Sequence, residues 1–308
     1  MRKLAGLIIA GPMQAVLVIS LCTVLSFLAP PITSLLSYVG AAAVGLYSLH
    51  NGLRPGLLVL AGAGLATGVL SELLVHQGIA IAVTSMFLWL PVWLAAVVLR
   101  ATRSLAMAML ALAAVAMLGV LLVYLLYGDP AYWWQVQLQA IADALAENQE
   151  LQLDSATLAG FVEQVAPLMT GSLAAGLGFA AVTCLMLGRW WQSLLVKPGA
   201  LRTEFYALRL NAGLSLAGIG LSVLAAANLG VVSSIALQWS LIAMVVFLFV
   251  GLAVLHATLA NLKAAKGWII AAYVLMSLLP QALLVVVVTG LLDPWVDLRR
   301  RTAKTETH

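Results

Sequence analysis

Glu72 and His76, in the stretch SELLVH, are the residues best suited to proton chemistry inside an apolar segment. They are four residues apart, so on a helix they share one face. Ionisable side chains are costly within a bilayer and mark functional sites by default. We therefore treat this pair as a candidate proton or ligand site. The alternative is that both side chains reach water at the level of the lipid headgroups.

Three glutamines also lie in otherwise apolar stretches and look buried. Gln14, Gln238 and Gln281 each carry an amide that can donate and accept hydrogen bonds. In membrane helices such side chains most often join neighbouring helices, and they contact a substrate less often. We retain all three as ligand-binding candidates, with interhelical bonding as the alternative.

The sequence lacks the spacings of common catalytic and metal sites. GxxxxGK[ST], GxSxG, HExxH and CxxC patterns are all missing. Cys22 and Cys184 both fall in apolar runs, which favours small core residues over a disulfide or a metal pair. We expect no enzymatic activity, no cofactor and no metal centre.

The elements that hold these residues are membrane spans. The 308 residues are 64% hydrophobic and 8% charged, whereas a soluble domain carries about 25% charged residues. Apolar runs of bilayer-spanning length recur along the chain, which predicts an all-α polytopic helical bundle with eight to nine transmembrane segments. With a net charge of +4 placed in short loops, nucleic acid is not an expected partner. The nine predicted segments are 4–28, 32–49, 56–75, 79–99, 104–127, 167–188, 211–229, 234–259 and 267–292.

Lys and Arg residues orient these segments. With the N-terminus in the cytoplasm, 11 of the 15 basic residues fall in loops on the cytoplasmic side, as the positive-inside rule demands. The other four, at positions 299–301 and 304, conflict with nine full crossings. Because Pro280 interrupts segment nine, that segment could be a broken or re-entrant hairpin returning to the cytoplasm. The alternative is that the rule fails at the last helix.

The connection 128–166 is predicted to lie outside the membrane. It is acidic, with no Lys or Arg, and its acidic residues are Asp129, Asp143, Glu147, Glu150, Asp154 and Glu163. Apolar residues within 131–150 recur at helical spacing, and Asp154 is a plausible N-cap for a second helix through Val165. We expect a small extracytoplasmic helical cap. It separates a five-span half, 1–127, from a second membrane half, 167–292.

The second half contains a charged elbow, 189–210. Gly188 ends the sixth segment, Arg189 and Trp190 then meet the inner interface together with Trp191, and Pro198–Gly199 breaks the chain. Leu201, Phe205 and Leu208 then share one helix face. The elbow is either an interfacial anchor or a docking site for a cytoplasmic partner. Its docking candidates are Gly188, Arg189, Trp190, Pro198, Gly199, Arg202, Glu204 and Arg209.

The tail 293–308 begins with the motif DPWVDLRRR. Asp293 before Pro294 predicts the N-cap of a short interfacial helix, because proline is favoured at the first helical position. Trp295 could then lie on the membrane, and Asp297 could pair with Arg301 four residues later. Arg299 completes this C-terminal motif.

Four stretches together resemble the YybS-like family of bacterial inner-membrane proteins. They are GLYSLHNGLRPGLLVL, GRWWQSLLVKPGALRTEFYALRL, KGWIIAAYVLMSLL and GLLDPWVDLRRR. The first six spans of that family are distantly similar to the substrate-binding subunits of energy-coupling-factor vitamin transporters. The resemblance implies location in the bacterial inner membrane and a small-molecule binding or transport subunit. The alternative is a membrane scaffold that recruits a cytoplasmic partner through 189–210.

The two functions differ in what they require. A binding subunit needs a cavity of roughly 300 Å³ or more beneath the 128–166 cap, since this is the lower end for ligand sites. A scaffold needs no such cavity.

Overall fold

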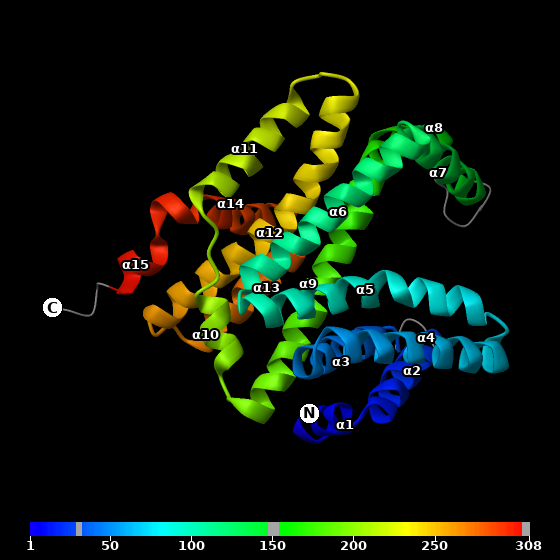
Figure 1. Ribbon diagram of the computed structural model, residues 1–308. Coiled ribbons are helices and arrows are strands. Elements are labelled where there is room, and N and C mark those ends of the chain that lie inside the picture. Colours follow the sequence, from blue (N-terminus) through cyan, green and yellow to red (C-terminus); the bar gives the residue numbers. More distant parts are fainter. Residues whose placement is uncertain (29–32, 147–153, 304–308) are drawn as a thin grey trace. The chain divides into compact units, whose positions relative to one another are not determined.

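The computed structural model describes residues 1–28, 33–146 and 154–303, and every regular element in these ranges is a helix (Figure 1). The predicted all-α class is confirmed. The helices are α1 (Arg2–Ala10), α2 (Pro12–Leu28), α3 (Leu35–Asn51), α4 (Leu53–Val75), α5 (Gly78–Thr102), α6 (Leu105–Tyr127), α7 (Pro130–Ala146), α8 (Ser155–Val165), the 3₁₀ turn η1 (Ala166–Leu168), α9 (Met169–Val196), α10 (Ala200–Tyr206), α11 (Ala212–Ala226), α12 (Val231–Asn261), α13 (Lys266–Leu278), α14 (Pro280–Val296) and α15 (Leu298–Ala303).

Several of these helices are long and apolar enough to cross a bilayer. Among the described residues there are five, namely α4, α5, α6, the run Ser155–Val196 and α12, or six if the bent pair α13–α14 forms one span. The chain is therefore a multi-pass membrane protein. Three other predicted segments form shorter helices, since α2 and α3 have 17 residues each and α11 has 15, against the roughly 20 that span the hydrocarbon core.

The chain divides into two compact units, and each combines separate stretches of sequence. The first unit contains Met1–Leu112 and Leu177–Arg209, and the second contains Ala113–Gly176 and Leu210–His308. Helices α6 and α9 contribute residues to both units. Each candidate site described below lies within one unit.

In the first unit, α2 packs against α3 and α4, and α4 packs against α5 (Figure 1). The predicted first span, 4–28, is not one helix, because it breaks at Gly11, whose backbone is extended. Proline disfavours the helical conformation of the residue before it, and Pro12 follows Gly11. Gly188 lets α9 approach α3 closely, since an added Cβ would lie 2.7 Å from the Ala42 carbonyl oxygen.

The second unit is built around α12, which has 31 residues and packs against α11 and α14. Glycines permit the contact with α14, because a Cβ at Gly290 would lie 2.1 Å from the Phe247 carbonyl oxygen and one at Gly251 would lie 1.9 Å from the Val286 carbonyl oxygen. Such small residues allow helix backbones to approach closely in membranes. Gly218, on α11, also allows a close contact, because an added Cβ would lie 2.5 Å from the Phe247 ring.

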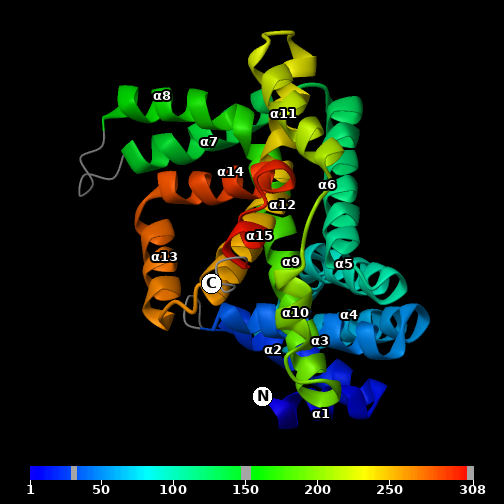
Figure 2. The same cartoon turned by 90° about the vertical axis from the view of Figure 1, so that its left-hand side faces the viewer.

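Helices α7 and α8 lie side by side as a hairpin (Figure 2). They confirm the predicted helices of the 128–166 connection, although residues 147–153, with Glu147 and Glu150, lie outside the described ranges. The Asp154 N-cap is confirmed, because its carboxylate accepts a hydrogen bond of 3.0 Å from the Thr157 backbone N–H. The extracytoplasmic position of this hairpin stays a prediction.

The predicted break at Pro280 is confirmed. Helices α13 and α14 meet at a bend of 116° (Figure 2), as expected of either a broken span or a re-entrant loop. Asn261, at the end of α12, donates hydrogen bonds of 3.0 Å to the Arg299 carbonyl oxygen and 3.2 Å to the Thr302 hydroxyl. These contacts place Arg299 at the same end of α12 as the loop with Lys263 and Lys266, as a re-entrant hairpin requires.

Candidate functional site

The turn between α9 and α10 follows from its sequence. Pro198 cannot continue a helix, and Gly199 adopts the left-handed conformation with φ of 87°, which glycine tolerates without strain. The predicted turn is therefore confirmed. The helix after it, α10, has seven residues, none of them buried, and it ends at Tyr206.

An ion pair joins the two arms of this turn. The guanidinium of Arg189, on α9, binds the carboxylate of Glu204, on α10, with two bonds. One joins Nε to Oε2 at 2.9 Å and the other joins Nη2 to Oε1. Arg189 also donates to the Gln192 side-chain oxygen at 2.6 Å. The Arg189 and Glu204 side chains are 21% and 31% exposed, so water reaches the pair.

A groove of about 1060 Å³ opens along this turn. Its charged lining comprises Arg189, Lys197 and Arg202 against one carboxylate, Glu204. The Arg202 guanidinium lies 5.1 Å from the centre of the Tyr206 ring, a cation–π contact that holds this charge beside the groove. The groove therefore has an excess of positive charge, which attracts anionic groups.

The tryptophans of the elbow have different environments. Trp190 is 39% exposed, which is compatible with the predicted place at a membrane interface. Trp191 is only 1% exposed, so it packs inside the protein, and its depth relative to the membrane interface stays a prediction. Successive residues on a helix point in directions about 100° apart, and Trp191 faces the core of the first unit. Leu208 is also buried, whereas Arg209 is exposed.

The C-terminal motif differs from its prediction. Asp293 and Pro294 lie inside α14, which continues to Val296, so Asp293 is not an N-cap. The helix ends at Asp297, which adopts a left-handed conformation with φ of 43°. Asp297 Oδ1 then accepts a hydrogen bond of 3.3 Å from the Arg300 backbone N–H at the start of α15. The N-cap position is therefore Asp297, four residues later than predicted.

Asp293 instead forms a buried ion pair with Arg299. Arg299 Nη2 donates to Asp293 Oδ2 at 2.5 Å, and the two side chains are 6% and 1% exposed for Arg299 and Asp293 respectively. The other carboxylate oxygen, Oδ1, is buried without a hydrogen-bond partner. Sequence spacing did not reveal this pair, because residues six apart do not share a helix face. The left-handed turn at Asp297 brings Arg299 back to Asp293.

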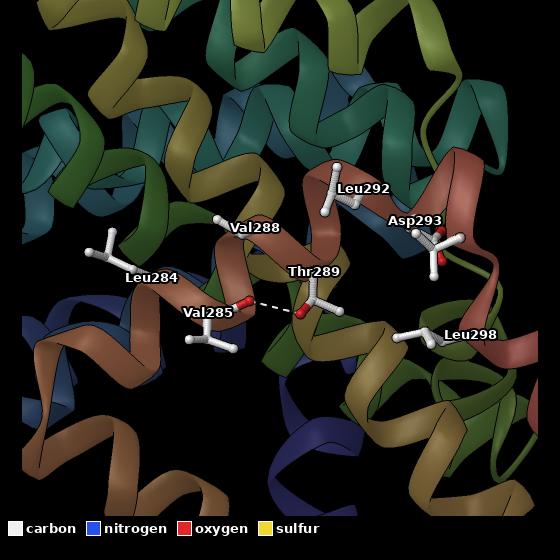
Figure 3. Close-up of a pocket in the computed structure, with 8 residues that line it drawn as sticks. Leu284, Val285, Val288, Thr289, Leu292, Asp293 and Leu298 are labelled. Carbon is white, nitrogen blue, oxygen red and sulfur yellow. Dashed lines mark hydrogen bonds between the residues drawn. The ribbon is translucent and has the colours of Figure 1, made fainter.

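A second cavity, of about 320 Å³, runs along the exposed side of α14 (Figure 3). Its lining is apolar except for Thr289 and Asp293, and the Thr289 hydroxyl bonds the Val285 carbonyl oxygen of its own helix at 2.8 Å. The lining residues are Leu284, Val285, Val288, Thr289, Leu292, Asp293, Val296 and Leu298. None of these residues belongs to the 128–166 connection.

Glu72 and His76 shape the connection between α4 and α5. Glu72 Oε2 accepts a hydrogen bond of 2.8 Å from the Gly78 backbone N–H, at the first residue of α5. A carboxylate there satisfies a donor that the helix leaves unpaired. His76 ends α4 in the left-handed conformation with φ of 55°. Both side chains are exposed. The contact that the structure shows for Glu72 is the cap of α5, and a proton or ligand site at this pair stays a prediction.

The three glutamines occupy different environments. Gln14 and Gln281 are exposed, so the expectation that they are buried is wrong for both. Gln238 is 1% exposed, and its side-chain amide donates to the Pro167 carbonyl oxygen and accepts from the Gly171 N–H. In a continuous α-helix these two backbone groups would bond each other. Gln238 therefore bridges the break between η1 and α9, which is the interhelical use expected of such a residue.

The fold and the site together define a class of protein. The chain is an all-helical, multi-pass membrane protein with a basic groove at the α9–α10 turn. Among the described residues, no cluster of three or more His, Cys, Asp or Glu could hold a metal ion, and Cys22 and Cys184 are both free thiols. No family model, curated protein or solved structure matches the chain.

Proposed function

We propose that this protein is a non-catalytic membrane scaffold that recruits a cytoplasmic partner through the 189–210 elbow. The observation that supports this proposal is the groove of about 1060 Å³ at the α9–α10 turn, lined by three basic side chains and one acidic one. Charged grooves of this kind steer the association of an oppositely charged partner.

The proposed topology counts the shorter helices α2, α3 and α11 as crossings, which gives eight crossings and one re-entrant hairpin. The N-terminus, the elbow and the C-terminal helix α15 all lie in the cytoplasm, which gives every Lys and Arg of the described residues a cytoplasmic place. The contacts of Asn261 with α15 support this arrangement. In line with the resemblance to the YybS-like family, we propose the bacterial inner membrane as the location.

A small-molecule binding or transport subunit is the second candidate. The cavity beside α14, about 320 Å³ in volume, reaches the lower end of the range for ligand sites, roughly 300 Å³. It favours this candidate by size. However, a cavity lined by α14 and α15 is not the cavity beneath the 128–166 cap that this function was expected to need, so we rank it second.

Labelling of single cysteines tests the topology. Thr203→Cys, Gln137→Cys and Arg300→Cys are placed in a chain whose two native cysteines are serines. A membrane-impermeant thiol reagent should label positions 203 and 300 from the same side and position 137 from the other. Labelling of positions 203 and 137 from one side would contradict the topology.

Recovery of partners tests the recruiting role. The full chain is purified from native membranes in mild detergent, beside a variant with Lys197→Gln and Arg202→Gln. The matched control is Arg300→Gln with Arg301→Gln, which removes the same charge away from the groove. A groove that recruits should lose its partner only in the first variant. Equal recovery with both variants would reject the role.

A further inference from the structure

We propose that Glu204 acts as an internal ligand of the basic groove, and that the partner's binding segment is an acidic peptide that displaces it. This inference rests on the proposed recruiting function and adds the chemistry of the partner and its regulation. In the free protein, the Glu204 carboxylate binds the Arg189 guanidinium. In the complex, a carboxylate of the partner takes its place.

The geometry at Arg189 is that of a ligand already bound. Both carboxylate oxygens of Glu204 accept from the guanidinium, through Nε and Nη2. This fork is the geometry in which arginine recognises a carboxylate from any source. An incoming Asp or Glu side chain can make the same two bonds, so the exchange costs no hydrogen bonds.

The pair is also exchangeable. Water reaches both side chains, which are 21% and 31% exposed, and ion pairs in such surroundings stabilise proteins little. Glu204 lies on α10, a helix of seven residues with none buried, joined to α9 through Pro198 and Gly199. Because no residue of α10 is fully buried, α10 can move without opening a buried core of its own.

The spacing of the basic residues favours a peptide as the occupant. Lys197 follows Arg189 by eight residues and still bonds the Ser193 carbonyl, so the two backbones are separated by roughly 12 Å at 1.5 Å per residue. A single phosphate group is too small to span that length, whereas a row of carboxylates on an extended chain can. The groove volume of about 1060 Å³ exceeds that of most small-molecule pockets, roughly 300–1000 Å³.

The experiment measures binding of a fluorescent hexaglutamate peptide to the full chain in phosphatidylcholine nanodiscs. Removing the internal competitor with Glu204→Gln should tighten binding by roughly two- to fivefold, the range that an exposed ion pair supports. The Lys197→Gln and Arg202→Gln variant should weaken it, and added salt should reduce all of these differences. Asp143→Asn removes the same charge from α7 and should leave binding unchanged.

A double-variant cycle separates competition from a change in structure. If Glu204 acts by occupying Arg189, then Glu204→Gln should give no gain in a chain that already carries Arg189→Gln. A gain of the same size in that background would overturn the inference, because Glu204 would then act by general repulsion.

The remaining outcomes separate this inference from the recruiting function. If the Lys197 and Arg202 variant weakens binding but Glu204→Gln does not tighten it, the groove binds acidic peptides and the internal ligand is rejected. If neither the natural chain nor Glu204→Gln binds the peptide, the inference of an acidic peptide fails. The recruiting function is then decided by the recovery of partners alone. If Glu204→Gln instead increases only the retention of phosphatidylglycerol added to the nanodiscs, the occupant is a lipid and the inference is overturned.

Discussion

Two arginine–carboxylate pairs in this chain have the same chemistry and opposite surroundings. Arg189 and Glu204 are 21% and 31% exposed at the α9–α10 turn, whereas Arg299 and Asp293 are 6% and 1% exposed at the end of α14. An exposed pair stabilises a fold little and can exchange partners. A buried pair can be broken only at the cost of leaving one charge unpaired. Burial therefore assigns the second pair to structure, and the exposure of the first pair is compatible with the recognition role that we propose for it.

The largest effect is expected from breaking the buried pair. Asp293→Asn removes the carboxylate charge that binds the buried Arg299 guanidinium, which should lower the free energy of unfolding by roughly 3–5 kcal/mol. Thermal or denaturant unfolding of the purified chain in detergent measures the change. The control replaces both residues, Asp293→Leu with Arg299→Met, and should restore most of the loss. If the double variant is as unstable as the single one, the loss comes from the missing contacts of the pair and not from the charge left on Arg299.

The next largest losses of stability are expected at the glycines where two helices approach closely. Gly290→Ala would place a Cβ 2.1 Å from the Phe247 carbonyl oxygen, and Gly188→Ala would place one 2.7 Å from the Ala42 carbonyl oxygen. Overpacking of this kind costs roughly 1–3 kcal/mol, and we expect the larger loss at Gly290. Gly220→Ala is the control, since nothing lies within 4 Å of its added Cβ. Equal stability of all three variants in thermal unfolding would contradict the close approach of these helices.

Breaking the exposed pair should have a small effect on folding. Glu204→Gln should change the free energy of unfolding by less than about 1 kcal/mol, and salt should reduce even that difference. The measurement is the same unfolding experiment at low and high ionic strength. A loss of unfolding free energy as large as that of Asp293→Asn would mean that both pairs stabilise the fold.

A third carboxylate, Asp154, extends the comparison to full exposure. Hydrogen bonds from the backbone N–H and the hydroxyl of Thr157 hold the pKa of Asp154 below its usual value. Since the folded pKa is lowered, the cap should be present above the ordinary pKa of aspartate and be lost as the pH falls through the lowered value. Asp154→Asn keeps a capping side chain that does not titrate. Hydrogen exchange of the first turn of α8 should rise in acid for the natural chain and not for this variant.

Features that depend on local sequence were predictable here. The turn at Pro198–Gly199, the break at Pro280 and the N-cap at Asp154 each follow from the conformational limits of one or two residues. Pro12 gives the same signal for the break at Gly11. The apolar run 4–28 is long enough for one span, however, and it was therefore predicted as a single segment. Local chemistry also has limits, because the N-cap predicted at Asp293–Pro294 lies inside α14.

Features that depend on tertiary contacts were not predictable from spacing. The Asp293–Arg299 pair forms only because Asp297 reverses the chain between them. Asn261 reaches α15 from a helix 38 residues earlier, and a sequence pattern gives no sign of that contact. The burial of Trp191 beside the half-exposed Trp190 likewise depends on which side of α9 faces the first unit.

The most direct test compares two isosteric changes in one set of samples. Glu204→Gln and Asp293→Asn each remove one negative charge from an arginine, and each variant is measured for thermal unfolding and for hexaglutamate binding in nanodiscs. We predict that Glu204→Gln keeps the stability of the natural chain and binds the peptide more tightly, while Asp293→Asn loses stability. A loss of stability in Glu204→Gln equal to that in Asp293→Asn, with no gain in peptide binding, would contradict the assignment of one pair to recognition and the other to structure.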